Sequence, residues 1–180
     1  RSVKISNSRR IIHSESTWHF LARLPGLREL SVSDSPAISA AVAALAAGRG
    51  SGGPRPALAR LRDLEYGLED LGVVQPRGEH VAALLAGLPE LRMLSIGKCS
   101  RISGVCLAVL PNPRLLHTLL LCEPDMDALL PMVAHLPGLR HVELREPEGP
   151  DATTVVRRMA RACPCLRTVT IHTPAAMELS

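Results

Sequence analysis

The chain has 180 residues, of which 46% are hydrophobic and only 2% aromatic, and its formal net charge is +4. This length suits one domain or one array of repeats, and the core has to be built from leucine, valine, isoleucine and alanine. The basic residues are scattered, with doublets only at Arg9-Arg10 and Arg157-Arg158, and almost no aromatic rings lie between them to stack on bases. The composition therefore argues against a nucleic-acid partner, and no run approaches the ~18–20 apolar residues of a membrane span.

A short aliphatic pattern, L-x-x-L-x-(L/I/V), recurs along the chain and predicts a series of short strands with one buried face. The steps between copies centre on the upper part of a ~20–29-residue repeat, with one long outlier. The middle slot of successive copies is occupied by Val3, Leu30, Leu64, Leu94, Leu119, Val142 and Val169.

Helix-like stretches separate the strands, and alanine-rich or helically spaced apolar residues mark them. Their predicted ranges are 17–24, 37–47, 79–88, 104–110, 125–136 and 151–163. Asp125 and Asp151 occupy N-cap positions, and Gly26, Gly48 and Gly138 are predicted helix stops. The Leu-Pro dipeptides that precede several strands are expected to end each helix and turn the chain into the next strand.

The long outlier contains the segment GRGSGGPRP at residues 48–56. Its glycines and prolines predict a flexible loop that lengthens one return from helix to strand. A phosphate-binding loop is the alternative, but no Gly-Lys-Ser/Thr follows and no strand leads directly into it.

One copy, LPELRMLSIGKCSRISG at residues 88–104, adds Cys99 and Ile102 to the aliphatic slots. With Cys163-Pro164-x-Leu166, this copy makes the chain resemble the cysteine-containing leucine-rich repeats found C-terminal to F-box domains, within the ribonuclease-inhibitor-like superfamily. The chain departs from that pattern in the later copies, where proline stands in the cysteine slot.

The recurring pattern and this resemblance together predict an α/β fold, a right-handed leucine-rich-repeat solenoid shaped as a horseshoe arc. A parallel β-sheet would line its concave face and helices its convex face. Residues 1–180 would form a single array of about seven repeats, the first and last incomplete, as a C-terminal fragment of a longer protein. Each repeat would bury its leucines against its neighbours.

The function expected is non-catalytic: recognition of a protein partner on the concave face. The resemblance narrows this to the substrate-binding repeat region of an F-box-type ubiquitin ligase receptor, which would reach a cullin ligase adaptor through an F-box preceding Arg1. The alternative is the sensor or inhibitor region of an innate immune receptor or of a ribonuclease-inhibitor-like protein.

The side chains that alternate with the buried ones on each strand would form the partner-binding surface. Met93, Leu120 and Cys122 are expected to form an exposed apolar row at its centre, with a polar rim around them, as protein-binding surfaces have. The predicted contact residues are Glu29, Asp63, Glu65, Met93, Ser95, Thr118, Leu120, Cys122, His141, Glu143, Arg145, Thr170 and His172.

The cysteine usage predicts free thiols and no metal. Five cysteines form no disulfide framework, which fits a reducing compartment, the cytoplasm or the nucleus. Cys99 is expected to pack under its turn. Cys163 and Cys165 form C-x-C without a second cluster that would complete a zinc site.

No enzyme and no cofactor are predicted. His141, Glu143 and Arg145 share one strand face and His172 lies one strand over, but a hydrolase would need a nucleophile beside the histidine. The nearby hydroxyls belong to threonines of the ordinary strand pattern, so a charged binding rim is the expected role of these residues.

Overall fold

The computed structural model describes residues 2–5, 24, 26–33, 58–67, 78–97, 105–147, 149 and 151–173. This part of the chain forms one seven-stranded parallel sheet in which the strands follow sequence order. The strands are β1 (Ser2–Ile5), β2 (Glu29–Ser33), β3 (Asp63–Gly67), β4 (Met93–Ile96), β5 (Thr118–Cys122), β6 (His141–Arg145) and β7 (Thr168–His172).

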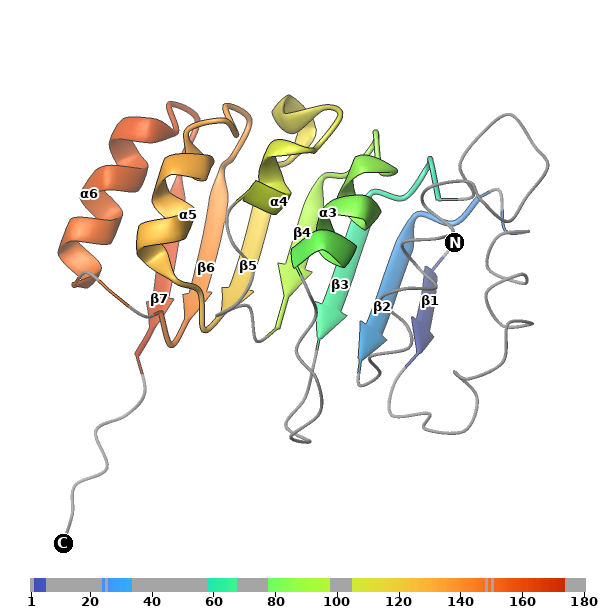
Figure 1. Cartoon of the computed structure of the whole chain (residues 1–180), viewed down its shortest axis with the longest axis horizontal. Helices are drawn as coiled ribbons and strands as arrows, with labels where there is room; N and C mark the ends of the chain where they lie inside the picture. Colours follow the sequence, from blue (N-terminus) through green and yellow to red (C-terminus); the bar gives the residue numbers. More distant parts are fainter. Residues whose placement is uncertain are drawn as a thin grey trace, which may run out of the picture.

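Helices alternate with the later strands and lie on one face of the sheet (Figure 1). They are α3 (Gly78–Ala86), α4 (Val105–Ala108), α5 (Met126–Val133) and α6 (Ala152–Ala162), with a short 3-10 helix η1 (Pro113–Leu115) before β5. The protein is thus an α/β protein in which an all-parallel sheet alternates with helices. No helix in the described part of the chain is long and apolar enough to cross a membrane.

The strand register confirms the predicted alignment of the aliphatic slots. The middle-slot residues are paired with one another from strand to strand: Val3, Leu30, Leu64, Leu94, Leu119, Val142 and Val169. Because side chains alternate between the two faces of a strand, a slip of one residue would turn each aliphatic set into water. The shared core therefore fixes the register.

Aliphatic side chains from both layers fill the space between the sheet and the helices. In the copy that ends with β4, Leu88, Leu91, Leu94 and Ile96 are all buried. Met159 of α6 is fully buried on the helical side of this core. The predicted alternation is confirmed along β4 and β5, where every second side chain is buried.

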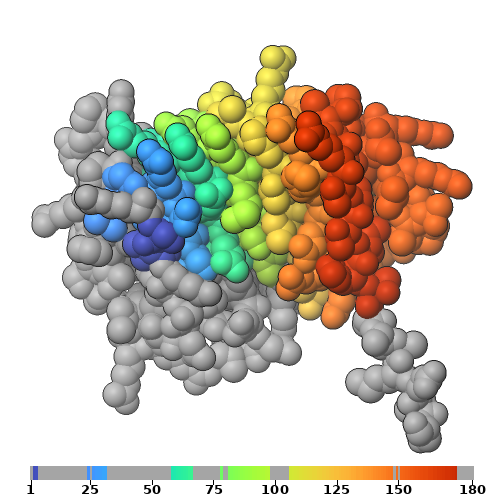
Figure 2. Space-filling model, turned by 180° about the vertical axis from the view of Figure 1, so that it is seen from behind, coloured from blue at the N-terminus to red at the C-terminus, as the bar shows by residue number. Residues whose placement is uncertain are grey.

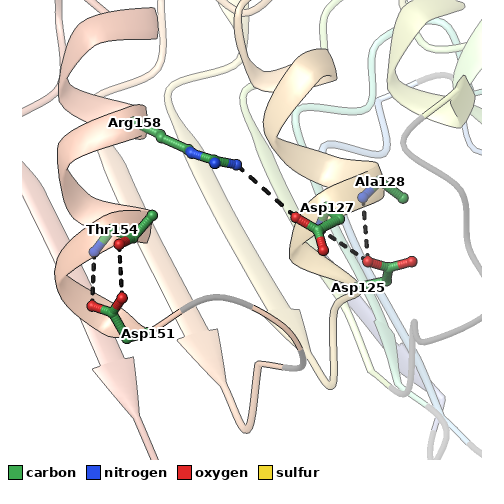
Figure 3. A network of polar contacts seen from close by, with 6 residues as sticks. All are labelled: Asp125, Asp127, Ala128, Asp151, Thr154 and Arg158. Carbon is green, nitrogen blue, oxygen red and sulfur yellow. Dashed lines mark hydrogen bonds and ion pairs between the residues drawn. The ribbon is translucent and has the colours of Figure 1, made fainter.

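Aspartates cap the N-termini of α5 and α6, as predicted (Figure 3). The Asp125 carboxylate accepts hydrogen bonds from the backbone N–H groups of Asp127 at 3.0 Å and Ala128 at 3.2 Å. Asp151 accepts bonds from the backbone N–H of Thr154 at 3.0 Å and from its hydroxyl at 2.7 Å. These bonds satisfy amide groups that have no partner within the helix, and the bonds from Thr154 lower the pKa of Asp151.

An ion pair joins the two capped helices, with Arg158 Nη1 of α6 lying 4.0 Å from Asp127 Oδ1 of α5 (Figure 3). Both side chains are more than half exposed, so this pair adds little stability. Burial of Leu129 and Val155, which face the core from the two helices, contributes more.

The four predicted helices within the described residues are confirmed, each ending earlier than predicted, but the role assigned to Gly138 is wrong. Helix α5 ends at Val133 with its cap at Ala134, well before Gly138. A Cβ atom at Gly138 would lie 1.9 Å from the backbone oxygen of Arg114 in η1. Glycine is needed there because the connections that lead into β5 and β6 come too close for any side chain.

The sheet ends at β7, where the aliphatic residues are less well covered. Val169 and Ile171 are only half-buried, whereas their partners Val142 and Leu144 in β6 are buried. The predicted helix 37–47, most of the predicted helix 17–24, the loop 48–56, Gly48 and Cys99 lie outside the described residues.

Candidate functional site

The sheet face opposite the helices, here called the open face, carries the side chains that alternate with the buried ones (Figure 2). Parallel pairing arranges them in rows that run across the strands. The first row contains Glu29, Asp63, Met93, Thr118, His141 and Thr168; the second contains Ser31, Glu65, Ser95, Leu120, Glu143 and Thr170; the third contains Cys122, Arg145 and His172.

Every predicted contact residue belongs to one of these rows, and none of them is buried. The exposed residues among them are polar and lie toward both ends of the sheet: Glu29, Glu65, His141, Arg145, Thr170 and His172. The sequence thus identified the residues of the open face, because the two-residue period of a strand assigns alternate side chains to opposite faces.

The predicted apolar row, however, does not exist. Met93 lies in the first row on β4, whereas Leu120 and Cys122 lie in the second and third rows on β5, so no row contains more than one of them. Each is half-buried rather than exposed. Leu120 is paired with Ser95 on one side and Glu143 on the other, so polar neighbours interrupt the apolar surface. Strand spacing alone could not show this, because it gives the face of each residue but not its neighbours across strands.

The charged residues predicted near the end of the sheet do meet. Glu143 Oε1 accepts a hydrogen bond from Arg145 Nε at 2.9 Å and lies 2.8 Å from Arg145 Nη2. His172 Nε2 approaches the same oxygen to 3.4 Å. His141, predicted to belong with these residues, lies in the first row and has no ion pair with Glu143 among the described contacts. The arrangement is a carboxylate oxygen approached by three nitrogen atoms, two from Arg145 and one from His172.

Acidic residues gather instead at β2 and β3. Glu29 and Asp63 are directly paired across these strands. Burial of the Asp63 carboxyl raises its pKa, the neighbouring Glu29 raises it further, and Arg62 and Arg92 oppose the effect. This end of the open face is therefore negative, and its charge is partly balanced by arginines at the edge of the sheet.

A column of basic residues that was not predicted from the sequence lies at that edge. The residue immediately before each strand from β2 to β7 is basic: Arg28, Arg62, Arg92, His117, Arg140 and Arg167. We call this set the basic column. These six residues are not scattered as expected, because all of them occupy the same slot in successive copies of the aliphatic pattern. Comparing slots across copies, instead of looking for runs along the chain, would have revealed them.

Backbone hydrogen bonds hold the column in line. The Arg92 carbonyl oxygen accepts bonds from the N–H groups of His117 at 2.8 Å and Thr118 at 3.1 Å. The His117 carbonyl oxygen accepts in the same way from Arg140 at 2.8 Å and His141 at 2.9 Å. The same pattern repeats along the sheet, so each basic residue is placed one strand from the next.

The surroundings of the column differ along its length. Arg62 lies 3.6 Å from Glu90, whereas no described acidic side chain forms an ion pair with Arg92, Arg140 or Arg167. Burial lowers the pKa of His117, and repulsion from Arg140, Arg92 and His141 lowers it further. From β4 to β7 the positive charge of the column therefore comes from Arg92, Arg140 and Arg167, and of these Arg92 also acts on the Asp63 carboxyl.

The cysteines of the described residues differ in their environments. Burial raises the pKa of Cys106 to about 11 and also raises that of Cys163. The Cys163 thiol donates a hydrogen bond to the Val133 carbonyl oxygen at 3.4 Å, and Cys165 is exposed. Within the described ranges, no group of three or more His, Cys, Asp or Glu side chains is arranged to hold a metal ion.

No protein-family model matches the chain, and no curated protein matches it significantly.

Proposed function

We propose that the chain is a leucine-rich-repeat solenoid, a right-handed horseshoe arc of about seven repeats, and that its concave face binds a protein partner. The constant register supports the repeat assignment, since the same slot of every copy is paired with its counterpart on the next strand. Stacked repeats bury their aliphatic faces in this way. The preference of parallel strand crossovers for the right-handed form supports the handedness.

The main support for a binding function is the composition and exposure of the open face. It presents partly exposed Met93 and Leu120 beside the charged group of Glu143, Arg145 and His172. No described helix covers this face (Figures 1 and 2). Protein interfaces combine apolar contact with a polar rim, and these strands offer both on a rigid sheet.

The narrower proposal is that the chain is the substrate-binding repeat region of an F-box-type ubiquitin ligase receptor. It is supported by the resemblance at Cys99 and Ile102 and at the Cys163-Pro164-x-Leu166 junction. In that case the tagged full-length protein, isolated from its own cells, should co-purify with a cullin and an F-box-binding adaptor. Their absence, when a known F-box protein recovers them in parallel, would refute the ligase assignment but not the binding surface.

The surface has its own test, in which Met93→Asp and Leu120→Asp are introduced together in the full-length protein. The matched control is Val109→Asp with Val156→Asp, which places the same charges on side chains that are 38% and 39% exposed on the helical side. We expect the first pair to abolish co-purification of a partner that the control pair retains, with circular dichroism showing both variants folded. Equal capture by both folded variants would show that the open face is not the site.

A further inference from the structure

The basic column has a spacing that suits an extended ligand. Adjacent strands lie about 4.8 Å apart, so the four positions from Arg92 to Arg167 span about 15 Å. The column lies at the N-terminal ends of β4 to β7, along the upper edge of the sheet in Figure 1. Arg92, Arg140 and Arg167 are exposed and His117 is half-buried between the first two.

No described acidic side chain forms an ion pair with Arg140 or Arg167, whereas the charge of Arg92 acts on the Asp63 carboxyl of the neighbouring strand β3. The first row beside it contains Met93, Thr118, His141 and Thr168, none of which is acidic. At β2 and β3 the first row holds Glu29 and Asp63 instead. Arg140 and Arg167 place like charges at the starts of the adjacent strands β6 and β7, which is unfavourable, and an anionic ligand would relieve that repulsion.

We propose that the basic column from β4 to β7 binds an extended segment rich in aspartate and glutamate, contributed by the protein partner. The inference rests on the proposed protein-binding function and defines the chemistry of one part of that partner. Arginine suits this role because its planar guanidinium donates two parallel hydrogen bonds to a carboxylate. An extended segment of about five residues covers 15 Å at ~3.3 Å per residue and can present acidic side chains to Arg92, Arg140 and Arg167.

The neighbouring surface favours a peptide over a nucleic acid. Glu65 and Glu143 lie in the second row, where they would repel phosphates that spread onto the open face. Tyr66, the one aromatic residue within the described part of the chain, is buried and cannot stack on bases. Met93, directly after Arg92, offers apolar contact to a peptide side chain.

The test measures binding of a fluorescein-labelled oligoglutamate peptide to the protein by fluorescence anisotropy, with oligoglutamine as the reference peptide. We expect binding of oligoglutamate alone, weakening as salt is added. Arg92→Gln with Arg140→Gln should weaken it about three- to tenfold, as expected for the loss of two exposed charge pairs. The lysine pair at both positions keeps the charge and should retain most of the affinity.

The matched control is Arg157→Gln with Arg161→Gln, which removes the same charge from exposed residues of α6 on the helical side. It should leave oligoglutamate binding within about twofold of the parent, since surface charges at this distance are screened. Equal weakening by both glutamine pairs, with both variants folded, would show that net charge alone attracts the peptide. Tighter, column-dependent binding of a single-stranded oligonucleotide would make this a nucleic-acid site, and either result overturns the proposal.

The two proposals can fail separately. In one outcome, the substitutions at Met93 and Leu120 abolish partner capture while those at Arg92 and Arg140 leave the affinity for oligoglutamate unchanged. In that case the open face binds a partner and the acidic-segment inference is wrong. If the affinity for oligoglutamate depends on the arginines while partner capture is unchanged by the substitutions at Met93 and Leu120, the column binds acidic segments and the open face is not the partner site.

Discussion

The substitution Leu119→Ala tests the shared core directly. Leu119 lies in the middle of β5, is 0% exposed, and is paired with Leu94 and Val142 on the adjacent strands. The substitution removes three buried carbon atoms, worth about 0.8 kcal/mol each, or about 2.4 kcal/mol in all. The cavity left in a stack that relaxes only partly adds to this, so we expect a loss of about 3 kcal/mol, within the ~2–5 kcal/mol range of such truncations.

The neighbouring residue provides the control. Leu120 has the same side chain on the same strand but lies half-buried on the open face, so Leu120→Ala should cost at most about 1 kcal/mol. Urea unfolding followed by far-ultraviolet circular dichroism gives both free energies of unfolding. Equal losses for the two variants, or a loss below about 0.5 kcal/mol for Leu119→Ala, would refute the assignment of β5 faces on which the site rests.

Three further predictions concern single positions. Gly138→Ala should lower the free energy of unfolding by about 1–3 kcal/mol, because its Cβ would lie 1.9 Å from the Arg114 carbonyl oxygen; an unchanged urea midpoint would contradict this close approach. Asp151 has a pKa below its ordinary value of 3.8, so its carboxylate stabilises the fold above about pH 4 and this contribution is lost as the pH falls through the folded-state pKa. Asp151→Asn should therefore reduce the loss of stability in acid, and parallel pH curves for the two proteins would show that the cap is not formed. Iodoacetamide should modify exposed Cys165 in the folded protein, whereas Cys106, buried with a pKa of about 11, should react only after unfolding; equal rates would contradict the burial.

Much of the fold could be predicted because its determinants are local and repeated. The aliphatic slots placed Leu94 and Leu119 on one face of adjacent strands, and the structure pairs them directly. The helix N-caps at Asp125 and Asp151 were predictable for the same reason, since a cap depends on residues within one helical turn.

For the candidate site, the sequence predicted which residues lie on the open face but not which of them are neighbours. The period of the strands placed Met93, Leu120 and Cys122 on the open face, but their neighbours depend on the register between strands. The same is true of the Glu143 group, in which Arg145 comes from the same strand and His172 from the next.

The sequence by itself determined which face of each strand packs against the core, because the aliphatic residues recur at every second position and therefore lie on one face. Only the tertiary structure decided which side chains of different strands are neighbours. Pairing of the strands placed five arginines and His117, which are far apart along the chain, in one basic column, and it brought the Arg114 carbonyl so close to residue 138 that only glycine fits. The physical reason is that contacts between adjacent strands and their connections depend on how connections of different length pass one another, and no local pattern encodes that.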